Sequence, residues 1–133
     1  MTYSVDTNVL LRFLVKDDSR KAQQVNKLIQ AAREDKKHLL IETAVIIEIA
    51  YVLDRYYKLP KGQVCEKLRS VLALSFVEIP DRDELSEAVE IYAIHGVDFI
   101  DALLFIRAMK NGRELISYDS GFDKLTPKLR HEP

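Results

Sequence analysis

The stretch "YSVDTNVLLRF" (residues 3–13) joins two kinds of local structure at one carboxylate. Residues 3–6 are predicted to form a short buried strand, and the apolar spacing from Asn8 onward predicts a helix. Asp6 therefore stands where a strand ends and a helix starts. Open α/β sheets bind their ligands at this edge, so Asp6 is a candidate functional residue.

The rest of the chain continues the alternation of strands and helices. Further strands are predicted at 38–42, 76–79 and 114–118. Helices are predicted from Ser19, over 43–57 with Thr43 as N-cap, from Pro60, from Asp81 to near Gly96, and from Asp98 to Asn111. This order predicts one α/β domain over residues 1–133, a three-layer α/β/α arrangement with a central, mainly parallel sheet of four to five strands.

Composition and charge argue against several classes of protein. The longest apolar runs, "IAYVL" (49–53) and "ALLFI" (102–106), are far shorter than a membrane span. Cys65 is the one cysteine, which excludes an internal disulfide and suits the cytoplasm; its neighbours predict a core position. The net charge of −1 disfavours indiscriminate nucleic-acid binding, yet residues 12–37 are rich in Lys and Arg and residues 78–101 are rich in Asp and Glu.

Three further acids are expected at the same edge as Asp6. Glu48 interrupts an apolar helix surface, Asp101 lies in the first turn of a largely apolar helix, and Asp119 follows the last predicted strand within "ISYDSGF" (116–122). Each has an ordinary alternative: an ion pair for Glu48, a helix-start role for Asp101 and a turn for Asp119. Asp98 is expected mainly as the helix cap.

Electrostatics favours a joint assignment of these four carboxylates. Two carboxylates about 5 Å apart repel by about 3 kcal/mol at an effective dielectric near 20, so four together need a compensating charge. An all-oxygen ligand set selects Mg²⁺ or Mn²⁺ over zinc. His38, His95 and His131 are scattered without metal-ligand spacing and are expected to have surface or ordinary polar roles.

Four stretches in order resemble the PIN domain family, in particular the VapC-type ribonuclease toxins of toxin–antitoxin pairs. They are "VDTNVLLRFLVKDD" (5–18), "ETAVIIEIAYVL" (42–53), "VDFIDALLFIRAMKNG" (97–112) and "LISYDSGFDKL" (115–125). The resemblance implies that Asp6, Glu48, Asp101 and Asp119 are the catalytic metal-site acids. Asn8 and Ser117 match supporting positions, with serine where threonine is frequent.

The resemblance implies a Mg²⁺- or Mn²⁺-dependent endoribonuclease, in which a metal-activated water hydrolyses RNA to 5′-phosphate and 3′-hydroxyl ends. Arg12, Lys16 and Arg20 are candidate phosphate contacts. A small antitoxin partner and a homodimer are also implied. Gly121 stands where many members carry a further aspartate, which leaves fewer ligands for a second metal; Asp123 is out of register and is expected in a turn or cap.

Two other functions remain open at this point. A PIN-like module that binds RNA or protein without catalysis is compatible with Gly121. A haloacid-dehalogenase-type phosphatase would use Asp6 as its nucleophile, but that chemistry generally has a second aspartate where this chain has Asn8. Metal binding with RNA cleavage separates the nuclease from both.

Overall fold

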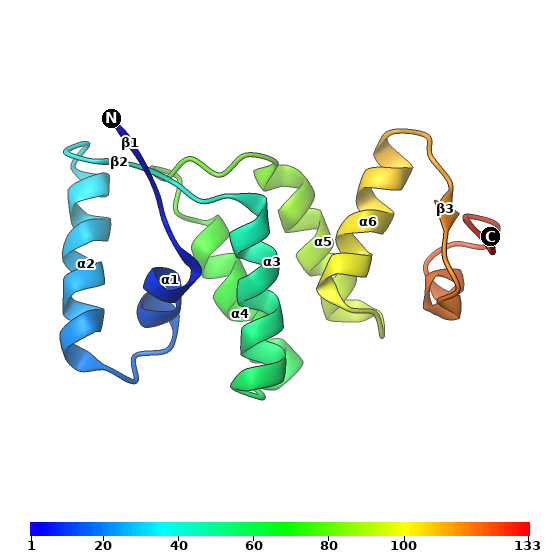
Figure 1. Cartoon of the computed structure of the whole chain (residues 1–133), viewed down its shortest axis with the longest axis horizontal. Helices are drawn as coiled ribbons and strands as arrows, with labels where there is room; N and C mark the ends of the chain where they lie inside the picture. The colour runs from blue at the N-terminus through cyan, green and yellow to red at the C-terminus, as the bar shows by residue number, and fades with distance from the viewer. The chain divides into compact units, whose positions relative to one another are not determined.

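A computed structural model describes residues 1–133, and the chain divides into two compact units, Met1–Asp81 and Arg82–Pro133 (Figure 1). The expected single domain over residues 1–133 stays a prediction. None of the helices is both long enough and apolar enough to cross a membrane.

The strands of the first unit run in parallel. Strand β1 (Thr2–Ser4) pairs with β2 (His38–Leu40), with Ser4 opposite Leu40. The Val5 amide extends this pairing by donating to the Leu40 carbonyl at 2.9 Å. The strand predicted at 76–79 is reduced to a single parallel bridge between Leu40 and Glu78. The first two predicted strands are thus confirmed in shorter form, but the expectation that the first is buried was wrong: all of β1 is exposed, and only Val5, directly after it, is buried before Asp6.

Four α-helices of the first unit fall close to the predicted positions. They are α1 (Thr7–Leu14), α2 (Ser19–Arg33), α3 (Thr43–Tyr51) and α4 (Lys61–Leu72). The Asp18 side chain caps α2 by accepting from the Lys21 amide. The assignment of Thr43 as N-cap was wrong by one residue: Glu42 holds that position in extended conformation. Pro60 is the N-cap of α4, so its fixed φ leads into the helix.

Helix α3 ends in a wider turn than the sequence predicts. Residues 52–56 form the π-helix η1 (Val52–Tyr56), and the Tyr57 amide donates to the Val52 carbonyl, five residues back, at 3.0 Å. The predicted helix over 43–57 is therefore continuous as a helix but changes its winding after Tyr51.

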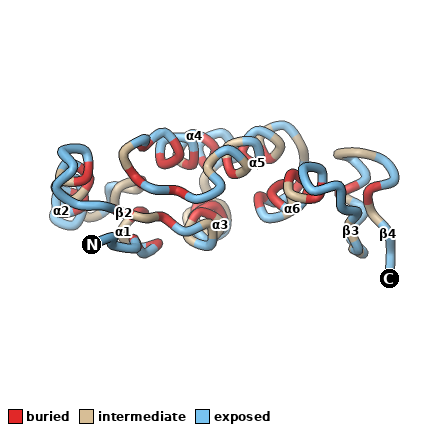
Figure 2. Tube along the Cα trace, turned by 90° about the horizontal axis from the view of Figure 1, so that it is seen from above, coloured by how far each residue is buried: buried red, intermediate tan, exposed pale blue.

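The core of the first unit comes from one side of each helix. Helix α1 packs against α2 and α3, and α3 packs against α4. Buried positions recur at about one-turn intervals, as Figure 2 shows along α4, where Val64, Cys65, Leu68, Val71 and Leu72 are buried. The predicted core position of Cys65 is confirmed.

The second unit consists of two packed helices and a small parallel sheet. Helix α5 (Arg82–Ile94) packs against α6 (Phe99–Lys110). Strand β3 (Leu115–Ile116) pairs with β4 (Arg130–His131), and the 3-10 helix η2 (Ser120–Lys124) lies between them in sequence. Asn111 is the C-cap of helix α6 and is followed by Gly112 at φ 61°, as the Asn-Gly pair predicts.

A compact apolar cluster holds this second unit together. It contains Phe105, Ile106, Ala108 and Leu129, with Ile91, Leu115 and Leu125 packed against them. Leu129, directly before β4, fixes that strand to the helices. The α/β class is confirmed, whereas the strands form two separate two-stranded sheets. The central sheet of four to five strands and its three-layer packing stay a prediction.

Candidate metal-binding and active site

The four predicted metal-site acids divide equally between the two units. Asp6 and Glu48 belong to the first unit, and Asp101 and Asp119 belong to the second. The structure holds no group of three His, Cys, Asp or Glu side chains disposed to bind a metal ion.

Asp6 occupies the strand-to-helix junction that the sequence predicts. It is the N-cap of α1, and its carbonyl accepts from the Val9 and Leu10 amides at 3.2 and 3.4 Å. Its carboxylate makes no capping hydrogen bond and is exposed. The neighbouring Thr7 is buried, so the backbone is anchored while the acid remains available to a ligand.

Glu48 lies on α3 between the fully buried Ile46 and Ile49, but its own side chain is exposed. Glu48 does interrupt an apolar helix surface as expected, but that surface is not buried, since Ala44 and Tyr51 beside it are exposed. No ion pair or hydrogen bond of its carboxylate is present, so the ion-pair alternative gains no support. Helices α1 and α3 pack together, yet no hydrogen bond links Asp6 and Glu48.

Asp101 and Asp119 lie close enough for their charges to interact. The pKa of Asp101 is raised above its usual value, first by partial burial and then by the negative charges of Asp119 and Asp98. Asp98 is the N-cap of α6 as predicted, although its side chain makes no capping hydrogen bond. The structure therefore brings two of the four predicted acids into electrostatic contact, within the second unit.

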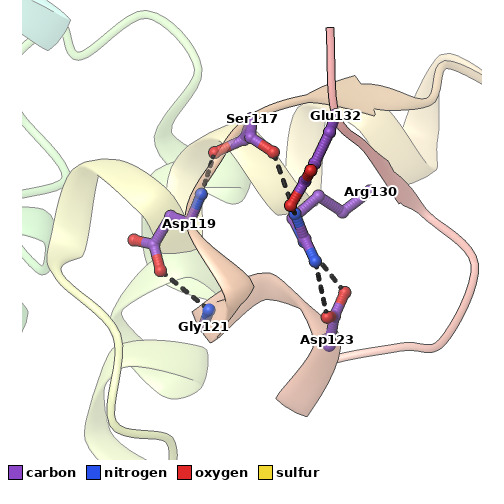
Figure 3. A network of polar contacts seen from close by, with 6 residues as sticks. All are labelled: Ser117, Asp119, Gly121, Asp123, Arg130 and Glu132. Carbon is purple, nitrogen blue, oxygen red and sulfur yellow. Dashed lines mark hydrogen bonds and ion pairs between the residues drawn. The ribbon is translucent and has the colours of Figure 1, made fainter.

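The loop after β3 fixes the orientation of Asp119. The Asp119 Oδ1 atom accepts from the Gly121 amide at 2.7 Å, and the Asp119 amide donates to the Ser117 Oγ atom at 2.9 Å (Figure 3). These contacts make Asp119 the N-cap of η2. The Ser117 hydroxyl thus supports Asp119 through its backbone.

Asp123 has a more specific role than the expected turn or cap. Its two carboxylate oxygens accept from the Arg130 Nε and Nη2 atoms at 3.2 and 3.0 Å (Figure 3). This hydrogen bonding holds the pKa of Asp123 below its usual value. The Asp123 carboxylate therefore already forms an ion pair with the Arg130 guanidinium.

A hollow between α1 and α2 begins two residues after Asp6. Its volume is about 340 Å³, and its lining consists of Asn8, Val9, Arg12, Lys21, Gln24 and Val25. Arg12, one of the candidate phosphate contacts, also forms an ion pair with Asp17 at 2.9 Å. Lys16 and Arg20 are exposed and do not line the hollow.

The structure adds Glu42, which sequence reasoning did not single out as a site candidate. Glu42 follows β2 as Asp6 follows β1, two residues after the paired Leu40 and Ser4. It is also an exposed helix N-cap without a capping hydrogen bond. The signal available in the sequence was its position between "HLLI" (38–41) and the helix start.

Comparison with known proteins gives two matches that cover most of the chain. The family model described as "PIN domain" matches residues 3–127, a range that includes all four acids. A protein of Aquifex aeolicus (strain VF5) named VapC ribonuclease is 27% identical over 122 residues, which cover 91% of this chain and 90% of that protein.

Proposed function

Because the chain belongs to the PIN domain family, we propose that it is a metal-dependent endoribonuclease, the toxin of a VapBC-type toxin–antitoxin pair. The observation that carries this proposal is the family match over residues 3–127, which contains the four acids in their expected order. The similarity to a VapC ribonuclease over nearly the full length of both proteins supports RNA as the substrate.

The acids present fit a hard divalent cation. Asp6, Glu48, Asp101 and Asp119 offer only carboxylate oxygens, which suit Mg²⁺ or Mn²⁺. The carboxylates of Asp6 and Glu48 form no ion pairs. The burial of the Asp101 carboxylate near Asp119 is unfavourable without a positive charge. The ion supplies charge stabilisation of the phosphodiester and activation of a water.

The side chains around these acids have separable tasks in this proposal. Asp6 is held by a backbone anchored at Val5 and Thr7, which limits its movement. Asp119 is oriented by the amide of Gly121 and by the hydroxyl of Ser117. Asn8, two residues after Asp6, lines the adjacent hollow and offers an amide to the substrate backbone.

We place the RNA phosphate contacts of this proposal on the basic segment of the first unit. Arg12 and Lys21 line the hollow beside Asn8, and Lys16 and Arg20 are exposed on the same stretch of chain. Cations here offset the repulsion between a polyanion and the acids. The target RNA would be read as a single strand or loop, because sequence readout requires unstacked bases.

The similarity to the VapC ribonuclease also supports two protein partners within this proposal. One is a small antitoxin, and the other is a second copy of the chain. The first unit holds several apolar residues that could form a homodimer contact. Leu11 and Leu14 are buried within it, whereas Tyr51 and Tyr56 are 64% and 77% exposed. The two tyrosines are therefore the better candidates for that contact.

The decisive test compares four conservative variants with one matched control. Asp6→Asn, Glu48→Gln, Asp101→Asn and Asp119→Asn should each remove most RNA cleavage and weaken Mn²⁺ binding. Glu66→Gln, at an exposed position of α4, should leave both unchanged. Sequencing of RNA ends after brief expression, wild type against Asp101→Asn, would identify the target.

Three outcomes would contradict the proposal. Full cleavage by two or more of the four variants would overturn the site assignment. RNA binding without cleavage in Mg²⁺ or Mn²⁺ would favour the non-catalytic PIN-like module. Turnover of small phosphoesters through an Asp6 intermediate would favour the phosphatase, an alternative to which the family match gives no support.

A further inference from the structure

Arg130 contacts both sides of the loop that carries Asp119 (Figure 3). Its Nη1 atom donates to the Ser117 carbonyl at 3.0 Å, two residues before Asp119. Its Nε and Nη2 atoms hold the Asp123 carboxylate at 3.2 and 3.0 Å, four residues after Asp119. One planar guanidinium thus links Ser117 and Asp123, the two ends of the segment 117–123.

Ser117 transmits this restraint to Asp119. The Ser117 amide donates to the His131 carbonyl at 2.9 Å, so Ser117 is fixed to the strand that carries Arg130. The Ser117 hydroxyl accepts from the Asp119 amide, and the Asp119 carboxylate accepts from the Gly121 amide. The hydrogen bonds from Arg130 to the Ser117 carbonyl, from the Asp119 amide to the Ser117 hydroxyl and from the Gly121 amide to the Asp119 carboxylate are 3.0, 2.9 and 2.7 Å long.

Arg130 is itself well placed to act as a rigid support. Its side chain is only 14% exposed, and the preceding Leu129 lies in the apolar cluster of the second unit. The Glu132 carboxylate gives a further, longer contact of 3.4 Å to Nη1. A lysine has no planar fork, so it cannot reproduce the two-oxygen contact with Asp123 and the Ser117 contact together.

We propose that Arg130 is a positioning residue for Asp119: it holds the 117–123 loop in the shape that aims the Asp119 carboxylate. This inference rests on the proposed nuclease function and extends it to a residue outside the family match, which ends at residue 127. Supporting hydrogen bonds of this kind typically change metal affinity or activity by about 10- to 100-fold.

Arg130→Met, which keeps an apolar stem, tests this role, with Arg130→Lys as the variant that keeps only the charge. Arg113→Met is the matched control, because Arg113 is an exposed arginine of the same unit with one long contact of 3.5 Å to the Arg107 carbonyl. Asp123→Asn weakens the same contact from the other side and serves if Arg130→Met fails to fold.

Three kinds of measurement are made: hydrogen exchange of the Asp119 and Gly121 amides, Mn²⁺ affinity of the folded protein, and RNA cleavage kinetics that give kcat and KM. Arg130→Met should accelerate both amide exchanges about 10-fold or more, weaken Mn²⁺ binding about 10- to 100-fold and lower kcat at unchanged KM. Arg130→Lys and Asp123→Asn should move the same quantities in the same direction, and Arg113→Met should move none.

Unchanged exchange and unchanged Mn²⁺ affinity, with only a lower melting temperature, would overturn the proposal and leave Arg130 as a structural contact. A raised KM at unchanged kcat would also overturn it and make Arg130 an RNA contact. If the wild-type protein neither binds Mn²⁺ nor cleaves RNA, the nuclease proposal fails, and amide exchange alone then decides whether Arg130 holds the loop.

Discussion

The Asp119 Oδ1 atom lies 2.7 Å from the Gly121 amide nitrogen, and a Cβ atom built on Gly121 would stand 2.9 Å from that same oxygen. The bond that orients the carboxylate therefore depends on the absence of a side chain at 121. The resemblance to the PIN domain family implies an aspartate at this position in many members. In this chain, a side chain at position 121 would displace the Asp119 carboxylate.

Gly121→Ala should consequently lower kcat for RNA by about 10-fold, because the Asp119 carboxylate must rotate away from the new methyl group. Stability should change by less than about 1 kcal/mol, because the loss of the Asp119 cap opposes the entropic gain of an alanine at a position without a positive φ. Thermal unfolding and cleavage kinetics measure the two effects. Gly62→Ala is the control, because nothing lies within 4 Å of its added Cβ; it should stabilise α4 and leave kcat unchanged.

Asp101→Asn should stabilise the metal-free protein at pH 7 while removing activity. The raised pKa of Asp101 means that its ionised form is disfavoured in the folded state, by burial first and then by Asp119 and Asp98. The destabilisation is absent below the usual value of 3.8 and grows as pH rises through the raised pKa.

In chelator, the Asp101→Asn melting temperature should therefore exceed that of wild type at pH 7, and the difference should vanish near pH 3. Added Mn²⁺ should raise the melting temperature of wild type and leave that of the variant unchanged. A variant that melts below wild type in chelator at pH 7 would contradict this account of Asp101.

Arg12 should have a measurable role in RNA binding despite its ion pair with Asp17. Arg12→Ala should raise KM about 3- to 10-fold. It should also lower the slope of log KM against log salt concentration by about 0.7, the value for one phosphate contact with a single strand. Asp17→Asn frees the guanidinium and should lower KM. Equal KM values for wild type and both variants, measured at two salt concentrations, would remove Arg12 from the RNA contacts.

Lys67 should stabilise the helix that starts at Asp6. Its Nζ atom donates to the Leu14 carbonyl at 2.8 Å, at the C-terminal end of α1. Lys67→Met should lower the free energy of unfolding by about 1–2 kcal/mol, because a partly buried carbonyl loses a charged donor. Lys27→Met, at an exposed position of α2, should change it by less than about 0.5 kcal/mol in denaturant unfolding.

Local signals in the sequence predicted the helices well. Apolar spacing and caps located α1, α2, α4 and α6 within a residue or two, and Asp6 was correctly expected at the end of a strand. These features depend on neighbours within a few residues. The α-to-π change after Tyr51 has no such local signal, and neither has the exposure of Glu48, which depends on what packs around α3.

Features that depend on distant partners were missed. Strand β4 at Arg130–His131 has no alternating apolar pattern and exists through its pairing with Leu115–Ile116. The contact of Arg130 with Asp123 and Ser117 follows from that pairing and was equally hidden. The proximity of Asp101 and Asp119 was expected from strand order and is present within the second unit.

The π-helical segment η1 inserts one backbone position between α3 and the chain leading to α4. An added position turns every later side chain by about 100° about the helix axis and leaves the earlier ones in place. In relatives with one residue fewer between Ile49 and Pro60, the residue equivalent to Glu48 should therefore point in the same direction as in this chain. The residues equivalent to Tyr56 and Tyr57 should point in a different direction. Variation in length at this point would alter the surface that the tyrosines present without disturbing the acid one turn earlier.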